Sequence, residues 1–137
     1  MVKKSRSITF GLMTERRSVP AHRKLIVWQR AIDLACACYK LAGQLPRYER
    51  FELAAQLRRS SSSVHANIAE GVGRRTRAEF TMFLSIARGS AMEVDSHTEM
   101  AVRVELLPRS EVERAQGLAN EIIRMLSTMM RRLAPLK

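Results

Sequence analysis

Residues 56–77 read QLRRSSSSVHANIAEGVGRRTR, and this stretch decides the fold. Apolar residues in and just before it recur at the spacing of one helix face, namely Leu53, Leu57, Val64 and Ile68. The serines at 60–63 are poor helix formers, so their small volume must matter more here than helix propensity. We therefore predict a helix that packs closely against a neighbouring helix at the serine run.

A tight turn is predicted directly after this helix. Gly71 and Gly73 are expected to supply the positive φ of a left-handed helix C-cap. Thr76 and Glu79 have the spacing of a capping box, which would start the next helix almost at once. The result is a helical hairpin with arginines at its tip and lower down, which are Arg74, Arg75 and Arg77, then Arg58 and Arg59.

Length and composition favour one all-α domain. The chain has 137 residues, of which 46% are hydrophobic and only 5% aromatic, and helices suit this composition better than a sheet. The net charge of +11 indicates an anionic partner, nucleic acid first and an acidic membrane second. Because no apolar run approaches the roughly 20 residues of a membrane span, we expect a soluble, cytoplasmic protein without membrane association.

The remaining helices complete an antiparallel up-down-up-down four-helix bundle over residues 25–137. The first is predicted over residues 27–43, with Trp28 and Tyr39 in the core rather than serving as base-stacking platforms. Glu49 is expected in the first turn of the second helix. The third helix is predicted over residues 77–104. The fourth is predicted to end at about Leu133, with Ser110 and Glu113 as a second capping box at its start.

A second patch of small residues lies in the middle of the third helix, formed by Gly89, Ser90 and Ala91. Counted outward from the turn, this patch comes level with the serine run. We expect the two backbones to approach closely there, so that leucine at Ser61 or Gly89 would overpack the contact.

Residues 1–24 form a basic arm without a clear hydrophobic period. Glu15 is its only acid, against the cations Lys3, Lys4, Arg6, Arg16, Arg17, Arg23 and Lys24. The arm is interpreted either as a solvated tail or as a nucleic-acid-binding segment.

The sequence offers no arrangement typical of an enzyme. His65 follows the serine run, but no acid is placed to orient its ring for nucleophilic catalysis. Cys36 and Cys38 project to different sides of a helix and lack further ligands at metal-binding spacing, so we expect buried or semi-buried free thiols and no metal or other cofactor. Met125, Met129 and Met130 add more apolar surface than one core stripe needs. They are interpreted either as residues that fill gaps in the core or as a second apolar face that favours self-association.

The chain resembles the four-helix-bundle proteins encoded within intervening sequences of bacterial 23S ribosomal RNA genes. The likeness rests on VWQRAIDL (27–34), Tyr39, Pro46 with Glu49, QLRRSSSSVHANIAEG (56–71) and GRRTRAEFTMFLSIARGSAMEV (73–94). It implies a bundle that assembles into a homopentamer, with no catalytic residues. It also implies a distant likeness to the accessory proteins of diversity-generating retroelements, which contact nucleic acid and a reverse transcriptase.

We therefore expect a non-enzymatic protein that binds RNA or DNA through phosphate contacts. The candidate nucleic-acid-binding residues are Arg58, Arg59, Arg74, Arg75 and Arg77. Their alternative role is a solvated face or ion pairs with Glu49, Glu52, Glu79 and Glu93. The alternative function is a scaffold or accessory subunit that docks an acidic protein, such as a reverse transcriptase.

Overall fold

The computed structural model describes residues 18–135, and this part of the chain forms four long α-helices. They are α2 (Ile26–Gln44), α3 (Leu53–Val72), α4 (Arg77–Arg103) and α5 (Arg109–Leu133). Two short 3-10 helices, η1 (Ala21–Lys24) and η2 (Arg47–Glu49), precede α2 and α3. The described residues contain no strand, and the all-α prediction is confirmed.

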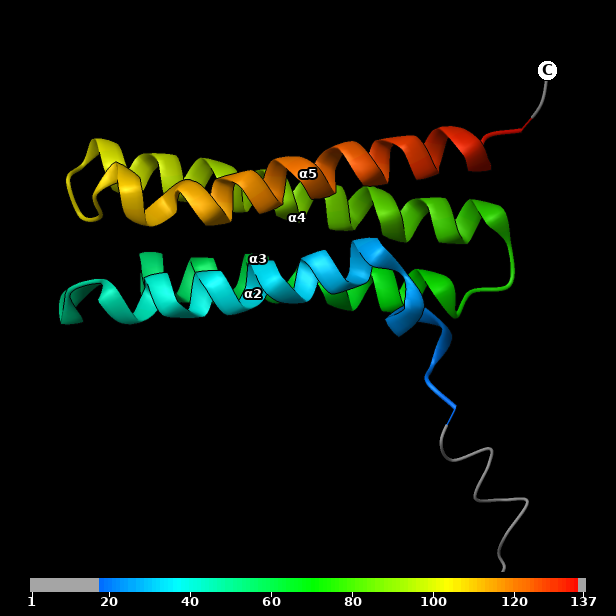
Figure 1. Cartoon of the computed structure of the whole chain (residues 1–137), viewed down its shortest axis with the longest axis horizontal. Coiled ribbons are helices and arrows are strands. Elements are labelled where there is room, and N and C mark those ends of the chain that lie inside the picture. The colour runs from blue at the N-terminus through cyan, green and yellow to red at the C-terminus, as the bar shows by residue number, and fades with distance from the viewer. Residues whose placement is uncertain (1–17, 136–137) are drawn as a thin grey trace, which may run out of the picture.

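The helices form an antiparallel up-down-up-down bundle, as predicted (Figure 1). α3 contacts α2 and α4, and α5 closes the ring by contacting both α4 and α2. Most of the predicted basic arm, residues 1–17, lies outside the described residues, and η1 at its end packs against α2 and α3. The topology brings the start of α2, the α3–α4 turn and the end of α5 to the same end of the bundle (Figure 1).

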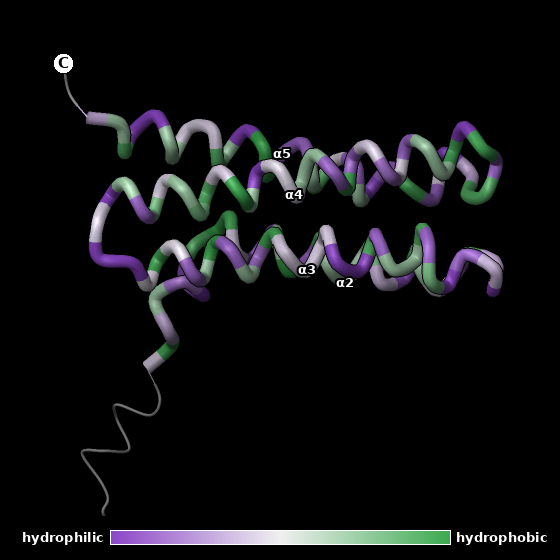
Figure 2. Tube along the Cα trace, turned by 180° about the vertical axis from the view of Figure 1, so that it is seen from behind, coloured by the Kyte–Doolittle hydropathy of each residue, from purple (hydrophilic) through white to green (hydrophobic). Residues whose placement is uncertain are grey.

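All four helices contribute to a core that runs along the bundle. Figure 2 shows hydrophobic positions alternating with hydrophilic ones along each helix. The largest fully buried side chains include Leu34 of α2, Leu57 and Ile68 of α3, Leu84 of α4 and Ile122 of α5. Each such side chain contributes roughly 1.5–3 kcal/mol when it is removed from water, so core burial is the main force that holds the helices together.

The serine run of α3 faces its neighbours, as predicted. Ser60 and Ser61 are buried. The Ser90 hydroxyl of α4 donates a hydrogen bond to Ser63 Oγ at 2.8 Å, and Ser60 donates to the Glu93 carboxylate at 3.2 Å. Small side chains thus let α3 and α4 approach, and their hydroxyls satisfy one another in the contact.

The expectation for Gly89 is wrong. This residue is exposed, and a Cβ added to it would meet nothing within 4 Å. Ser90 and Ala91, which are buried, make the contact with α3 instead. Only one face of α4 can meet α3, and Gly89 lies on another.

The expectation that Tyr39 lies in the core is also wrong, because its side chain is 51% exposed. α2 carries two apolar stripes, and the stripe through Leu34 and Cys38 is the one that faces the core. Trp28 lies on the other stripe and is partly buried against the core, with the His22 ring packed edge-on at 5.3 Å between ring centroids.

The α3–α4 turn differs from its prediction. Neither Gly71 nor Gly73 has a positive φ, and Gly73 lies at −80°. Gly71 is buried within α3, where an added Cβ would lie 2.9 Å from Phe80 Cδ1 and 3.0 Å from Phe83 Cβ. Glycine is needed here for the close approach of α4 and not for left-handed backbone.

Left-handed backbone occurs instead at Glu105, which has a φ of 64°. The N–H of Leu106 donates to Ala101 O at 2.8 Å, and the N–H of Glu105 donates to Val102 O at 3.0 Å. These two bonds are those of a Schellman motif, which ends α4.

Side chains support the starts of α3 and α4. Thr76 Oγ1 accepts a hydrogen bond from the Glu79 N–H at 3.1 Å, as predicted. Glu49 lies in η2 before α3, and its carboxylate accepts from the Leu53 N–H at 3.2 Å. Both contacts satisfy amide groups that a helix start leaves without partners.

The predicted cap of α5 by Ser110 is wrong. The helix begins earlier, at Arg109, and no side chain caps it. Pro108 precedes the helix with an extended backbone and has no N–H to satisfy, which places Ser110 inside the first turn.

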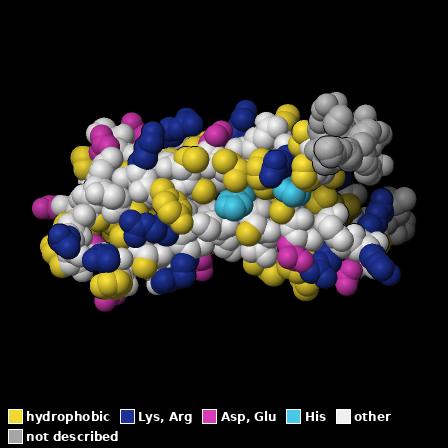
Figure 3. All heavy atoms as spheres, turned by 90° about the horizontal axis from the view of Figure 1, so that it is seen from below, with side chains coloured by type: hydrophobic (Ala, Val, Ile, Leu, Met, Phe, Trp, Pro, Cys, Tyr) yellow, Lys and Arg dark blue, Asp and Glu magenta, His cyan; other side chains and the backbone are white. Residues whose placement is uncertain are grey.

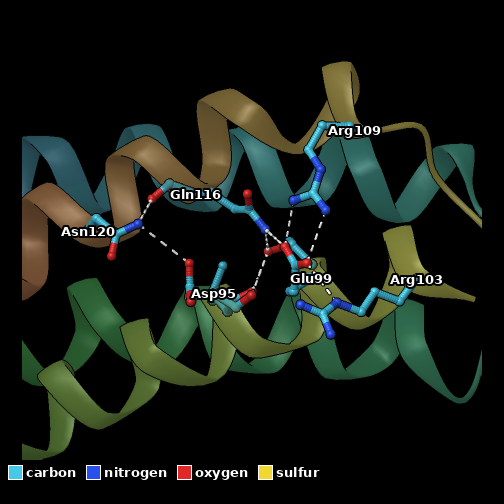
Figure 4. Close-up of polar contacts among 8 residues, drawn as sticks. Asp95, Glu99, Arg103, Arg109, Gln116 and Asn120 are labelled. Carbon is cyan, nitrogen blue, oxygen red and sulfur yellow. Dashed lines mark hydrogen bonds and ion pairs between the residues drawn. The ribbon is translucent and has the colours of Figure 1, made fainter.

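A polar network joins α4 to α5 near the link between them (Figure 4). The Glu99 carboxylate accepts hydrogen bonds from Arg109 at 2.6 and 3.0 Å, from Arg103 at 3.0 Å and from Gln116 at 3.2 Å. The hydrogen bonds from Arg109, Arg103 and Gln116 lower the pKa of Glu99 to about 2. Glu99 therefore stays ionised at ordinary pH and fixes the position of the start of α5.

Candidate nucleic-acid interface

Three cationic segments meet at one end of the bundle, which we call the basic end. They are η1 before α2, the α3–α4 turn and the last turn of α5 (Figure 1). Their cations are all exposed and comprise Arg23, Lys24, Arg74, Arg75, Arg77, Arg131 and Arg132. The nearby acids are Glu70 and Glu79. The basic end therefore presents an excess of positive charge to solvent, as an anionic ligand requires.

Arg74 is held in position by two neighbours. It forms an ion pair with Glu70, one helical turn earlier, and its guanidinium carbon lies 4.9 Å from the centre of the Phe83 ring. An exposed ion pair of this kind contributes only about 0–1 kcal/mol, so a phosphate can replace the carboxylate at little cost. Arg75 and Arg77 form no ion pair with any other described residue.

The structure does not bring Arg58 and Arg59 to the basic end. They precede Arg74 and Arg75 by sixteen positions in the sequence, which is about 24 Å along a helix axis. The Arg58 guanidinium lies over the Tyr39 ring of α2 at 5.8 Å, and Arg59 is exposed. The five predicted arginines thus form two separate groups on the α3–α4 hairpin.

The alternative role predicted for the five arginines was to form ion pairs with four glutamates, and the described part of the chain does not contain these ion pairs. Within residues 18–135, none of the five pairs with Glu49, Glu52, Glu79 or Glu93. Glu49 and Glu93 instead accept hydrogen bonds from Leu53 and Ser60. Four of the five guanidinium groups therefore have no carboxylate partner in the described part of the chain.

The opposite end of the bundle has mixed charge. It contains the η2 segment and the α4–α5 link, where acids and arginines alternate. The acids are Glu49, Glu52, Glu105, Glu111 and Glu113, and the arginines are Arg47, Arg50, Arg103, Arg109 and Arg114. The bundle is thus polarised along its length, with its positive excess at the basic end.

The sequence-based choice of contacts omits four cations of the basic end. Arg131 and Arg132 appear in the sequence only as complements to a helix C-terminus, and Arg23 and Lys24 only as part of the arm. They lie far from residues 74–77 in sequence. The predicted up-down-up-down topology could have revealed these four cations. In such a bundle the start of the first helix, the turn between the second and third helices and the end of the fourth helix lie at the same end.

The histidine and cysteine side chains were considered in the sequence as possible metal ligands or catalytic groups. Residues 18–135 contain no cluster of three or more His, Cys, Asp or Glu side chains that could hold a metal ion. Burial lowers the pKa of His65. Burial also raises the pKa of Cys38 to about 12, against a smaller opposite effect of its hydrogen bond with Ser61. The Cys38 thiol is thus neutral in the core. Cys36 is exposed, so the expectation that both thiols are at least partly buried is wrong for this residue.

Apolar side chains are exposed at several places on the bundle. Figure 3 shows hydrophobic side chains in patches between charged ones on the face seen from below. Exposed large residues include Tyr39, Tyr48 and Phe51 on the α2–α3 side, and Met82, Ile86, Met92 and Met100 on α4. Met125, Met129 and Met130 pack partly buried against the core. None of the helices in residues 18–135 is both long and apolar enough to cross a membrane.

The fold and the basic end define a class of protein: a small antiparallel four-helix bundle with cations concentrated at one end. The chain belongs to the 23S rRNA-intervening sequence protein family, whose pattern matches residues 23–128. This confirms the family resemblance inferred from the sequence.

One similar solved structure is a protein from Bacteroides thetaiotaomicron, described as a protein with unknown function from the S23 ribosomal protein family. The two chains are 27% identical and superpose with a TM-score of 0.73, over 77% of this chain and 99% of the other. No curated protein matches this chain.

Proposed function

We propose that the protein binds nucleic acid, RNA in the first instance, through the phosphate groups that its basic end attracts. The observation that carries this proposal is the convergence of three exposed cationic segments on one end of the bundle. The name of the family, which refers to ribosomal RNA, supports RNA as the first ligand to test. Arg74, Arg75 and Arg77 form the centre of the proposed interface, and Arg58 with Arg59 is a second, separate group of candidate contacts on α3.

The recognition we propose is of the backbone and not of the bases. Guanidinium groups bind phosphate oxygens, and such contacts carry no sequence information by themselves. Binding releases condensed counterions from the nucleic acid, so affinity should fall steeply as salt is added. The protein is proposed to act by binding, without catalysis, in the cytoplasm.

Self-association would strengthen this binding. The family resemblance implies a homopentamer, and the exposed apolar residues Met82, Ile86, Met92 and Met100 on α4 offer surface that a second subunit could bury. A ring would present several copies of the basic end to one RNA molecule. The overall affinity would then exceed that of one subunit without any new contact.

The experiment is a titration of labelled ribosomal RNA with the full chain at low salt, followed by fluorescence anisotropy. We expect saturable binding whose affinity falls by roughly a thousandfold between about 50 and 200 mM salt, as six or so phosphate contacts would require. A morpholino oligomer of the same base sequence, which has no charged backbone, is the control and should not bind. Absence of RNA binding at low salt, or equal binding of the morpholino, would remove the proposal.

A further inference from the structure

A groove with an apolar floor and basic edges opens between the start of α2 and the end of α5. Its volume is about 570 Å³. Its lining combines apolar residues, among them Ile26, Met125 and Met129, which we call the floor, with the exposed cations Lys24, Arg124 and Arg132, which we call the edges. Ile26 is 58% exposed although it is the first residue of α2, which contributes to the core. The groove is thus an apolar surface that the fold leaves open to solvent.

The cations along the groove are regularly placed. Arg124, Thr128 and Arg132 are four residues apart on α5, so they form one row about 12 Å long beside the methionines. Lys24 stands at the α2 side. Within residues 18–135 none of the cations Lys24, Arg124 and Arg132 forms an ion pair. The row is as long as about two turns of a helix lying along it.

A nucleic-acid ligand would account for the cations at the edges of this groove but not for the apolar side chains of its floor. A phosphate backbone needs cations and gains nothing from isoleucine and methionine side chains. Methionine is common at surfaces that bind helical peptides, because its flexible, polarisable side chain adapts to the partner. An occupant that uses both features must combine an apolar face with negative charge at its borders.

We propose that this groove binds an amphipathic helix of a partner protein, with apolar residues against Ile26 and Met129 and acidic residues beside Lys24, Arg124 and Arg132. This is the helix-in-groove mode of recognition, in which apolar anchors follow the i, i+3, i+4, i+7 spacing. Acids spaced four or eight residues apart on the incoming helix match the spacing of Arg124 and Arg132. Charge selects the partner, and apolar burial supplies most of the affinity.

Charge argues against two other occupants. Residues 1–17 precede Lys24 in the sequence, but they carry Lys3, Lys4, Arg6, Arg16 and Arg17 against Glu15 alone. A second copy of the chain carries a net charge of +11. Both would bring positive charge to a positive rim, which is unfavourable. An acidic helix is the occupant that the rim favours.

The test measures binding of a fluorescein-labelled peptide of about 18 residues, long enough to form a helix, with leucines on one face and glutamates at its borders. Two peptides serve as controls: one has lysine in place of each glutamate, and the other has the same composition in scrambled order. The full chain is titrated into each, and RNA affinity and molecular mass are measured on the same samples. Ile26→Gln and Arg124→Gln alter the groove. Their matched controls are Met92→Gln, at an apolar residue exposed elsewhere, and Arg114→Gln, at an exposed arginine of the same helix.

We expect the acidic amphipathic peptide to bind, and each groove variant to weaken it by about tenfold, whereas the control variants leave it unchanged. Lys24 and Arg132 belong to the basic end as well, so the uncharged Ile26 distinguishes the two ligands. RNA affinity should be the same in Ile26→Gln as in the wild type, because phosphate contacts do not use this side chain. Failure of RNA binding with peptide binding intact would overturn only the RNA proposal. Equal binding of the scrambled or lysine peptide, or absence of peptide binding, would overturn this one. So would a change of molecular mass in Ile26→Gln, because the groove would then be an interface between copies.

Discussion

The Ser90 hydroxyl of α4 donates a hydrogen bond to Ser63 Oγ of α3 at 2.8 Å. The contact lies well back from the turn that joins the two helices, so it helps fix how far one helix slides along the other. The same hairpin carries Arg74, Arg75 and Arg77 at its tip. Packing between small side chains in the bundle thus determines where the guanidinium groups of the basic end stand.

Replacing Ser61 with leucine should destabilise the protein by about 1–3 kcal/mol, because the site is fully buried and has no room for the larger side chain. Urea unfolding followed by circular dichroism measures this. Gly89→Leu is the matched control on α4, where the side chain would enter open space. It should leave the stability unchanged or raise it by up to about 1 kcal/mol, since leucine is the better helix former. Equal stability of Ser61→Leu and the wild type would contradict the close packing of α3.

The glycines of α3 and α5 should respond in opposite directions to alanine. Gly71→Ala should destabilise the fold by about 1–3 kcal/mol, because its Cβ would lie 3.0 Å or less from side-chain atoms of Phe80 and Phe83. Gly117→Ala should stabilise it by about 0.5–1 kcal/mol, because a Cβ there meets nothing within 4 Å. Thermal melts of both variants provide the comparison. A stabilising effect of Gly71→Ala would show that α4 approaches less closely than described.

The two thiols should differ in reactivity. Burial raises the pKa of Cys38 to about 12, so its thiolate is scarce at pH 8, whereas Cys36 is exposed. Ellman's reagent should modify one thiol per native chain at this pH and both thiols in urea. Cys36→Ser should remove the fast reaction, and Cys38→Ser should leave it. Fast reaction of both thiols in the native protein would mean that the core around Cys38 opens readily.

Acid should weaken the junction of α4 and α5. The hydrogen bonds from Arg109, Arg103 and Gln116 lower the pKa of Glu99 from 4.5 to about 2. A lowered carboxyl pKa stabilises the fold above pH about 4.5, and this contribution is lost as the pH falls from there through about 2. Melting temperatures of the wild type should therefore exceed those of Glu99→Gln at pH 6 and converge with them near pH 2. A constant difference across this range would show that the charge of Glu99 does not stabilise the junction.

Periodicity accounts for most of the fold that could be predicted. The spacing of Leu57, Val64 and Ile68 predicts a buried face on α3, and these residues are fully buried. Periodicity cannot choose between the two apolar stripes of α2. The prediction that Tyr39 lies in the core is wrong for this reason. That choice depends on where the neighbouring helices lie.

Local backbone geometry was harder to predict than helix position. Glycine is the residue that best tolerates left-handed backbone, yet Gly71 and Gly73 do not adopt it and Glu105 does. Gly71 is required by the nearby rings of Phe80 and Phe83, a tertiary contact that no local pattern reveals. Similarly, the basic end is formed by segments that are distant in the sequence. The arginine-rich turn therefore predicts only some of its cations.

The two arginine groups of α3 and the turn should contribute unequally to RNA binding. Arg75 and Arg77 stand with the other cations of the basic end, whereas Arg58 lies over Tyr39 about 24 Å away. We therefore expect Arg58→Gln with Arg59→Gln to lower RNA affinity less than neutralisation of the turn.

The decisive measurement compares loss of equal charge from the two ends of the bundle. One variant changes Arg74, Arg75 and Arg77 to glutamine, and the other changes Arg47, Arg50 and Arg114, which are exposed toward the opposite end. RNA affinity is measured for both across a series of salt concentrations. Neutralising the turn should reduce the slope of log affinity against log salt by about two to three and weaken binding at least tenfold at low salt, whereas the other variant should bind as the wild type does. Equal losses in the two variants would mean that RNA responds to net charge alone and that the basic end is not its binding surface.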